Sequence, residues 1–154
     1  FGAMLPGKDT EALEKQSMLF EEFLIAENNA GRMKLDLQAL EQSKALVHGH
    51  CHQKAFGLVP TVKEVLGWIP NLDVELIESS CCGMAGAFGY EAEHYSTSIK
   101  MAELDLLPAI RKASDDTLIV ADGTSCRCQI RDGSTREGWH VARVLENALA
   151  TRNT

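Results

Sequence analysis

Three stretches of this chain share one pattern, in which a short apolar run is followed by cysteine and then by a helical periodicity. The apolar runs are Lys44–His48, Val74–Glu78 and Thr117–Ala121, and the cysteines after them are Cys51, the adjacent pair Cys81 and Cys82, and Cys126. Short apolar runs that alternate with amphipathic segments are typical of βαβ units, whose strands are parallel. The pattern therefore predicts an α/β fold, a small parallel sheet with helices on both faces.

The cysteines are expected to meet at one edge of this sheet. Each of them follows a predicted strand, and the carboxyl ends of parallel strands lie at the same edge, where α/β proteins bind their ligands. The fold thus places the cysteines at the C-terminal strand ends. Side chains far apart in the sequence would then line one site.

The helical periodicity and the chain length predict how the rest is organised. With 154 residues and 45% hydrophobic content, the chain can form one substantial core. We expect an N-terminal helix and linker over residues 1–43 and a cysteine-rich domain over residues 44–154. The expected helices run from Asp9 to Glu27, from Pro60, from Ala92 to Lys112 with a bend near Pro108, and from Trp139 to Leu149.

Composition excludes several classes of function. Acidic residues outnumber basic ones by 22 to 15, giving a net charge of -7, so a nucleic acid partner is not expected. The sequence contains neither an apolar run of membrane-spanning length nor a secretion signal, which predicts a cytoplasmic protein without a transmembrane segment. No nucleophile triad or pair of catalytic carboxylates stands out, and no catalytic residue is assigned.

The cysteines favour metal or redox chemistry. Five are present, an odd number that suits a disulfide framework poorly. Four thiolates are the usual complement of a cubane iron–sulfur cluster or a closed zinc site. The adjacent pair Cys81 and Cys82 suits two different metal atoms, and Gly83 lets the chain turn tightly beside them. In Cys126-Arg127-Cys128 the second cysteine is an optional ligand, a redox partner of the first or an incidental thiol.

Three histidines surround the first cysteine. His48, His50 and His52 occupy alternate positions, where they could ligate a metal, donate hydrogen bonds to its ligands or carry protons. A purely structural role fits each of them equally well. His52 is kept as a candidate metal ligand, whereas His48, within the strand end, is expected to be structural.

Three segments resemble a known family. His48–Ala55, Ser80–Gly86 and Gly123–Ile130 are similar to the motifs of the cysteine-rich CCG domain. That domain occurs in heterodisulfide reductase, in the iron–sulfur subunits of glycolate oxidase and anaerobic glycerol-3-phosphate dehydrogenase, and in lactate-utilisation proteins. The sequences of the first two segments most resemble the C-terminal domain of FAD-linked oxidase–ferredoxin fusion proteins.

The resemblance implies a function and a set of ligands. It implies an electron-transfer domain of a flavin-linked oxidoreductase acting on a 2-hydroxy acid or a similar substrate, with FAD in another part of the parent protein. The implied cofactor is an iron–sulfur cluster of the 4Fe-4S type, and the matching residues are Cys51, Cys81, Cys82, Cys126 and Gly83. Two features depart from the family pattern: Cys128 stands where the FAD-linked branch often has histidine, and the stretch from Cys82 to Cys126 is long.

The same resemblance implies partners. These are a flavoprotein domain or subunit, a ferredoxin-like module and a second CCG domain, since the family commonly carries two in tandem. Such partners would also allow a peripheral position at the inner membrane. Because the flavin site would lie elsewhere, the sequence leaves open whether the chain is itself an enzyme.

Two alternatives come from other classes of function. One is a structural zinc-binding module that mediates assembly. The other is a thiol–disulfide redox domain that uses Cys81 with Cys82 or Cys126 with Cys128. Metal content and colour would separate them from a cluster protein.

Overall fold

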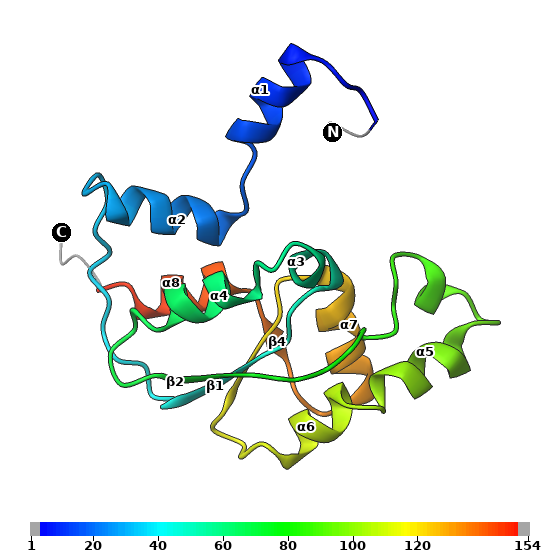
Figure 1. The fold of residues 1–154 in the computed structure, drawn as a ribbon. Helices are drawn as coiled ribbons and strands as arrows, with labels where there is room; N and C mark the ends of the chain where they lie inside the picture. The colour runs from blue at the N-terminus through cyan, green and yellow to red at the C-terminus, as the bar shows by residue number, and fades with distance from the viewer. Residues whose placement is uncertain (1–3, 151–154) are drawn as a thin grey trace. The chain divides into compact units, whose positions relative to one another are not determined.

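The structure is a computed structural model that describes residues 4–150. The chain forms two compact units, Phe1–Lys34 and Leu35–Thr154. The first holds two helices, and the second holds the sheet and the remaining helices (Figure 1). The described elements are, in chain order, α1 (Lys8–Gln16), α2 (Phe20–Asn29), β1 (Lys44–Val47), α3 (Cys51–Ala55), α4 (Val59–Leu66), β2 (Asp73–Leu76), the 3-10 helix η1 (Phe88–Tyr90), α5 (Tyr95–Ala102), α6 (Leu106–Lys112), β3 (Leu118–Val120), α7 (Thr124–Gly133), β4 (Gly138–Trp139) and α8 (Val141–Ala148).

The first unit has two helices where the sequence predicts one, over Asp9–Glu27. The break lies at Ser17, whose backbone is extended, with φ −88° and ψ 124°, and whose hydroxyl donates to the Leu13 carbonyl at 2.9 Å. A new helix then begins, because the Glu22 carboxylate accepts a hydrogen bond from the Leu19 N–H at 2.8 Å. A side chain that satisfies a free N-terminal donor stabilises a helix start. One amphipathic run therefore becomes α1 and α2.

The second unit is built on a four-stranded sheet in the order β2-β1-β3-β4, and each neighbouring pair is parallel. This arrangement confirms the predicted α/β fold. The first three strands fall within the three apolar runs or overlap them closely. The fourth differs from the expectation, because the helical pattern assigns Trp139 to the closing helix. The structure instead pairs Trp139 with Val120 and begins α8 after His140.

Helices cover both faces of the sheet, as expected. Figure 1 shows α4 and α8 on one face and α6 with α7 on the other. On the α6 and α7 face, Ile119 of β3 packs with Leu106, Ile110 and Ile130 in a buried core that also contains Cys82 and Cys126. The cysteine site is therefore continuous with the apolar core. Burial of that core fixes the positions of its inner members.

Some helices begin or end at unexpected places. The segment predicted as one bent helix, Ala92–Lys112, is two helices, α5 and α6, separated at residues 103–105. Pro108 explains this break, because its ring clashes with the carbonyl four residues earlier and it has no N–H to donate. At the third position of α6 that missing donor costs nothing, since the first turn has no acceptor for it. Between residues 4 and 150, no helix has both the length and the apolar character that crossing a membrane requires.

The strand order favours a ligand site at the edge of the sheet between β1 and β3. The chain passes from β1 outward to β2 and then returns to the other side of β1 as β3, so the direction of winding reverses there. In α/β sheets, ligands bind beside the carboxyl ends of the strands at such a reversal. The ladder extends to this edge, where the His48 N–H donates to the Val120 carbonyl at 2.8 Å. The segments after β1 and β3 are thereby held side by side.

Candidate metal centre

The cysteines that follow β1, β2 and β3 differ in burial. Cys82 and Cys126 are buried, with 3% and 0% exposure, whereas Cys81 is half-buried and Cys51 is exposed. All of them are free thiols. The adjacent residues Cys81 and Cys82 thus occupy different environments, one nearer the surface and the other facing the core.

Three side chains form an inner group of potential metal ligands. One donor atom from each of His48, Cys82 and Cys126 lies within 4.8 Å of the other two, and all three residues are buried. Each comes from a different segment, after β1, β2 and β3 respectively. Thiolate and imidazole are ligands that zinc, copper and iron–sulfur centres share. The inner group can therefore hold a metal.

The two inner thiols, Cys82 and Cys126, have pKa values shifted in opposite directions. The Cys126 thiol, as a hydrogen-bond partner, lowers the pKa of Cys82 from 9.0 to about 4, against the opposing effect of burial, and His48 and the Met84 backbone lower it further. The same contact with Cys82, together with burial, raises the pKa of Cys126. Near neutral pH the pair therefore carries one thiolate, on Cys82. A thiolate is the form that binds metals.

The outer thiols are coupled to the inner ones. Partial burial raises the pKa of Cys51, the neighbouring Cys81 thiol raises it further, and the Lys54 ammonium opposes both. Negative charge on Cys51 and Cys81 also contributes to the raised pKa of Cys126. The Gly83 N–H donates to the Cys81 sulfur at 3.3 Å. The four thiols therefore form one electrostatic set.

Two glycines allow the backbone to approach this set closely. Gly83 has φ +92°, and a Cβ there would lie 2.1 Å from the Ser98 carbonyl oxygen. At Gly123, a Cβ would lie 2.3 Å from His50 Cδ2 and 3.0 Å from the Cys126 sulfur. A larger residue at Gly83 would displace either the turn that carries Cys82 or α5, and one at Gly123 would displace His50 or Cys126.

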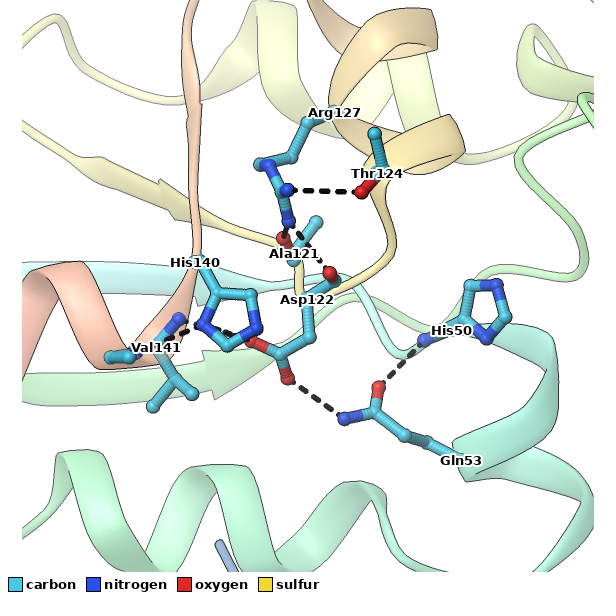
Figure 2. Close-up of polar contacts among 9 residues, drawn as sticks. His50, Gln53, Ala121, Asp122, Thr124, Arg127, His140 and Val141 are labelled. Carbon is cyan, nitrogen blue, oxygen red and sulfur yellow. Dashed lines mark hydrogen bonds and ion pairs between the residues drawn. The ribbon is translucent and has the colours of Figure 1, made fainter. Parts of the chain in front are cut away.

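Helix α3 is connected to the segment after β3 through Gln53. Gln53 Nε2 donates to Asp122 Oδ2 at 2.8 Å, and Gln53 Oε1 accepts from the His50 N–H at 3.0 Å (Figure 2). His50 caps α3, whose first residue is Cys51. These contacts place Cys51 relative to the chain that leads to Cys126.

The next residue of α3 connects it to the segment after β2. Lys54 Nζ donates to the carbonyls of Ser79 and Ser80, the latter at 2.6 Å, and lies 3.4 Å from the Ser79 hydroxyl. Ser80 directly precedes Cys81. The consecutive side chains of Gln53 and Lys54 therefore connect α3 to the segments that lead to Cys126 and Cys81.

Asp122 is the centre of the contacts in Figure 2. Its Oδ1 accepts from the Val141 N–H at 3.0 Å and lies 3.7 Å from His140 Nδ1, so that it also caps α8. The Arg127 guanidinium donates to the backbone carbonyls of Ala121 and Asp122 at 2.9 and 2.6 Å. The turn from β3 into α7 is thus held from both sides.

Besides Cys51 and Cys81, two predicted ligands lie outside the inner group. Cys128 follows Cys126 by two residues on α7, about 200° around the helix axis. It interacts with Tyr90 and raises the pKa of that phenol. His52 is exposed, and its ring centroid lies 4.8 Å from that of Phe56. As ligands, both stay predictions, and Cys128 packs against the core that contains Cys82 and Cys126.

Sequence reasoning expected His48 to be structural, whereas the structure places its imidazole among the donor atoms of the inner group. The alternation of side-chain directions along β1 could have predicted this position of the His48 side chain. Side chains two residues apart on a strand share a face, so His48 lies on the same face as Leu46. Leu46 packs against the core that contains Cys82 and Cys126.

Comparisons with known proteins associate the chain with dehydrogenases. It is 33% identical over 107 residues to a subunit of the anaerobic glycerol-3-phosphate dehydrogenase of Escherichia coli strain K12, and equally to that of strain O157:H7, a match covering 70% of this chain and 26% of the relative. It is 34% identical over 58 residues to the D-2-hydroxyglutarate dehydrogenase of Escherichia coli strain K12, covering 38% of this chain and 6% of the relative. No family model and no solved structure matches it. The chain spans about a quarter of the length of the first curated relatives, and it is related in sequence to a part of these oxidoreductases.

Proposed function

We propose that the chain is an electron-transfer domain that binds an iron–sulfur cluster through Cys51, Cys81, Cys82 and Cys126. The observation that carries the proposal is the convergence of three strand-end segments on one electrostatically coupled set of thiols. Four thiolates are the usual protein ligands of a 4Fe-4S cluster. When bound, such a cluster accepts and releases single electrons.

The positions of the adjacent cysteines support a centre with several metal atoms. Cys82 is buried beside Cys126, whereas Cys81 is half-buried and interacts with Cys51. Side chains that diverge in this way suit different metal atoms better than a single ion. Together with His48, the site offers five soft or borderline donors, one more than a tetrahedral zinc ion uses.

The surroundings fit an anionic sulfur-rich group. The Gly83 N–H donates to the Cys81 sulfur, and the Met84 backbone forms a hydrogen bond with Cys82. The Lys54 ammonium lies near enough to Cys51 to favour its thiolate. Backbone donors and nearby charge of this kind set the reduction potential of a thiolate-bound centre.

The relatives support the wider role. One is named as part of a glycerol-3-phosphate dehydrogenase and another as a D-2-hydroxyglutarate dehydrogenase. We infer that residues 44–154 form the cysteine-rich domain of a larger oxidoreductase acting on a 2-hydroxy acid or a similar substrate, with residues 1–43 as helix and linker. FAD, a ferredoxin-like module and a second domain of the same kind would belong to other parts or partners. The parent protein would be cytoplasmic, or held at the inner membrane by those partners.

A single zinc ion is the second candidate, and the inner group favours it. Its three donor atoms are close enough to one another to bind one ion, and Cys51 or Cys81 could complete the coordination. The site would then stabilise the fold and transfer no electrons.

Anaerobic purification and reconstitution with iron and sulfide test the proposal. We expect a brown protein with about four irons and four sulfides per chain. Cys82→Ser should lose this centre, because a serine oxygen is a hard and rarely ionised ligand. The matched control Cys128→Ala and the variant Cys128→His should keep it.

Three outcomes would contradict the proposal. A colourless protein with one zinc per chain that takes up no iron and sulfide favours the zinc module. A metal-free protein that cycles between dithiol and disulfide favours the redox domain. A full centre in Cys82→Ser together with its loss in Cys128→Ala would move the site to the Cys126-Arg127-Cys128 segment.

A further inference from the structure

His48 is a buried polar side chain whose imidazole has one unpaired nitrogen. The residue is 1% exposed. Its Nδ1 lies 2.8 Å from the Ser79 hydroxyl, whereas Nε2 has no hydrogen bond of standard geometry within the described residues 4–150, although His48 interacts with the Cys82 thiol and lowers its pKa. Buried polar atoms are nearly always paired, so an unpaired one in a native structure calls for an explanation such as an ion.

The position of His48 is fixed by the sheet. Its N–H donates to the Val120 carbonyl at 2.8 Å and continues the ladder between β1 and β3. On the face that it shares with Leu46, it lies with Cys82 and Cys126 in the inner group, whose donor atoms are within 4.8 Å of one another. A backbone hydrogen bond just beyond the end of β1 therefore holds this residue in the group with the two buried thiols.

The other ring nitrogen is held by a chain of donors and acceptors. Lys54 Nζ lies 3.4 Å from the Ser79 hydroxyl and donates to the backbone carbonyls of Ser79 and Ser80. An ammonium group can only donate, so the Ser79 oxygen acts as an acceptor toward it. The second lone pair of that oxygen can accept from His48 Nδ1–H, and the Ser79 O–H can instead donate to Nδ1 in the other tautomer. A proton on Nδ1 leaves the lone pair of Nε2 free. Metal-binding histidines commonly donate their second ring N–H to an oxygen in this way.

We propose that His48 Nε2 is a nitrogen ligand of the metal centre, beside the sulfurs of Cys82 and Cys126, and that Ser79, by accepting a hydrogen bond from Nδ1–H, orients the ring in the tautomer that makes it one. This inference rests on the proposed function in that it assumes a metal centre at this edge of the sheet. It changes the expected ligand set from four thiolates to a mixed set of thiolates and one imidazole. Exchange of thiolate for imidazole raises the reduction potential of iron–sulfur centres.

The alternative role for the same ring is a hydrogen bond from Nε2–H to the Cys82 thiolate. In that case Nδ1 would accept from the Ser79 hydroxyl. The two roles differ in whether nitrogen is bonded directly to metal, which magnetic resonance measures without reference to activity.

Pulsed electron paramagnetic resonance of the full chain, reconstituted with iron and sulfide and then reduced, provides the first test. Protein grown with ¹⁵N-histidine should show a nitrogen hyperfine coupling characteristic of a directly bound imidazole, changed from its ¹⁴N pattern. The coupling should vanish in His48→Gln and persist in the matched variant His52→Gln, whose side chain is exposed. A wild-type protein with a full centre and no such coupling would overturn the proposal, as would a coupling that survives His48→Gln.

Cobalt(II) binding to the metal-free reduced chain provides the second test, and separates this inference from the proposed function. Wild type should show the visible bands of tetrahedral cobalt with mixed sulfur and nitrogen ligands, and Ser79→Ala should bind cobalt about tenfold more weakly, as loss of an orienting partner does. Circular dichroism of each variant checks folding. If the chain binds cobalt through His48 but never assembles iron and sulfide, the result contradicts the proposed iron–sulfur cluster and supports His48 as a metal ligand. If the chain assembles a full iron–sulfur centre that is bound only through sulfur, the result supports the proposed function and overturns the assignment of His48 as a ligand.

Discussion

Gly83→Ala tests the close approach between the Cys81–Cys82 turn and helix α5. The backbone of Gly83 has φ +92°, a conformation that residues with a side chain rarely adopt. An added Cβ would also lie 2.1 Å from the Ser98 carbonyl oxygen and 3.1 Å from Gln129 Nε2. Because the first of these atoms is backbone, no side-chain rotation relieves the overlap, and the turn or α5 must move.

The magnitude follows from two contributions. Positive φ costs a residue with a side chain about 1–2 kcal/mol. Displacement of Ser98 also strains the buried bonds from Gln129 Nε2 to the Ser98 carbonyl and hydroxyl, at 3.1 and 3.0 Å, and a buried group left unpaired costs about 1–3 kcal/mol. We therefore expect Gly83→Ala to lower the free energy of unfolding by about 2–5 kcal/mol, a large part of the total for a domain of this size.

Gly86→Ala is the matched control. Gly86 lies in the same segment at φ +68°, but nothing lies within 4 Å of an added Cβ. Only the backbone contribution applies, so the loss should be about 1–2 kcal/mol. Urea denaturation of the metal-free reduced proteins, followed by circular dichroism and tryptophan fluorescence, measures both values. Equal destabilisation by the two variants would refute the steric argument, and a neutral Gly83→Ala would refute the whole account of this turn.

Two further predictions concern the same edge of the sheet. Asp122→Ala removes the acceptor of the Val141 N–H at the start of α8, where His140 remains as the N-cap, and it also removes the acceptor of Gln53. It should lower the free energy of unfolding by about 1–2 kcal/mol and weaken metal binding, as denaturation and cobalt titration would show. Asp132→Ala, which breaks only an exposed ion pair, should change stability by less than about 0.5 kcal/mol. The pKa of Cys82 lies at about 4 in the folded chain and at 9.0 ordinarily, so its thiolate adds stability that is complete above pH 9.0 and is lost as the pH falls through about 4. The difference in unfolding free energy between metal-free wild type and Cys82→Ser should therefore shrink from about pH 8 to about pH 4, and a difference independent of pH would contradict it.

The parallel sheet, and the edge of it at which the cysteines lie, were predictable because both follow from the periodicity of apolar residues in the sequence. Apolar runs of strand length alternating with helical patterns allow few topologies, and parallel strands bring their carboxyl ends to one edge. Helix α3 was not predicted, because its five residues are too few to show a period. The first turn of α7 was likewise missed, since Cys126 and its neighbours have no apolar stripe of their own.

The composition of the inner group was harder to predict, because it depends on which way single side chains point. Cys126 and Cys128 are equivalent by type, yet residues two apart on a helix do not face the same way. The strand-end position of His48 suggested packing, whereas its side chain shares the face on which Cys82 lies. Such distinctions require knowing that Cys126 is helical and where β1 ends, which periodicity gives only to within a few residues.

The inner and outer ligands are positioned by different forces, which bears on how a metal would be held. His48, Cys82 and Cys126 are fixed by the buried core and by the β1–β3 ladder, so they stay close together before any metal binds. Cys51 depends instead on α3, a helix of five residues that polar contacts fasten to its neighbours. A short helix is marginal by itself, and hydrogen bonds at a partly exposed site contribute little each. The inner group would therefore supply the more rigid ligands of a metal centre, and α3 would supply Cys51 as a less rigid one.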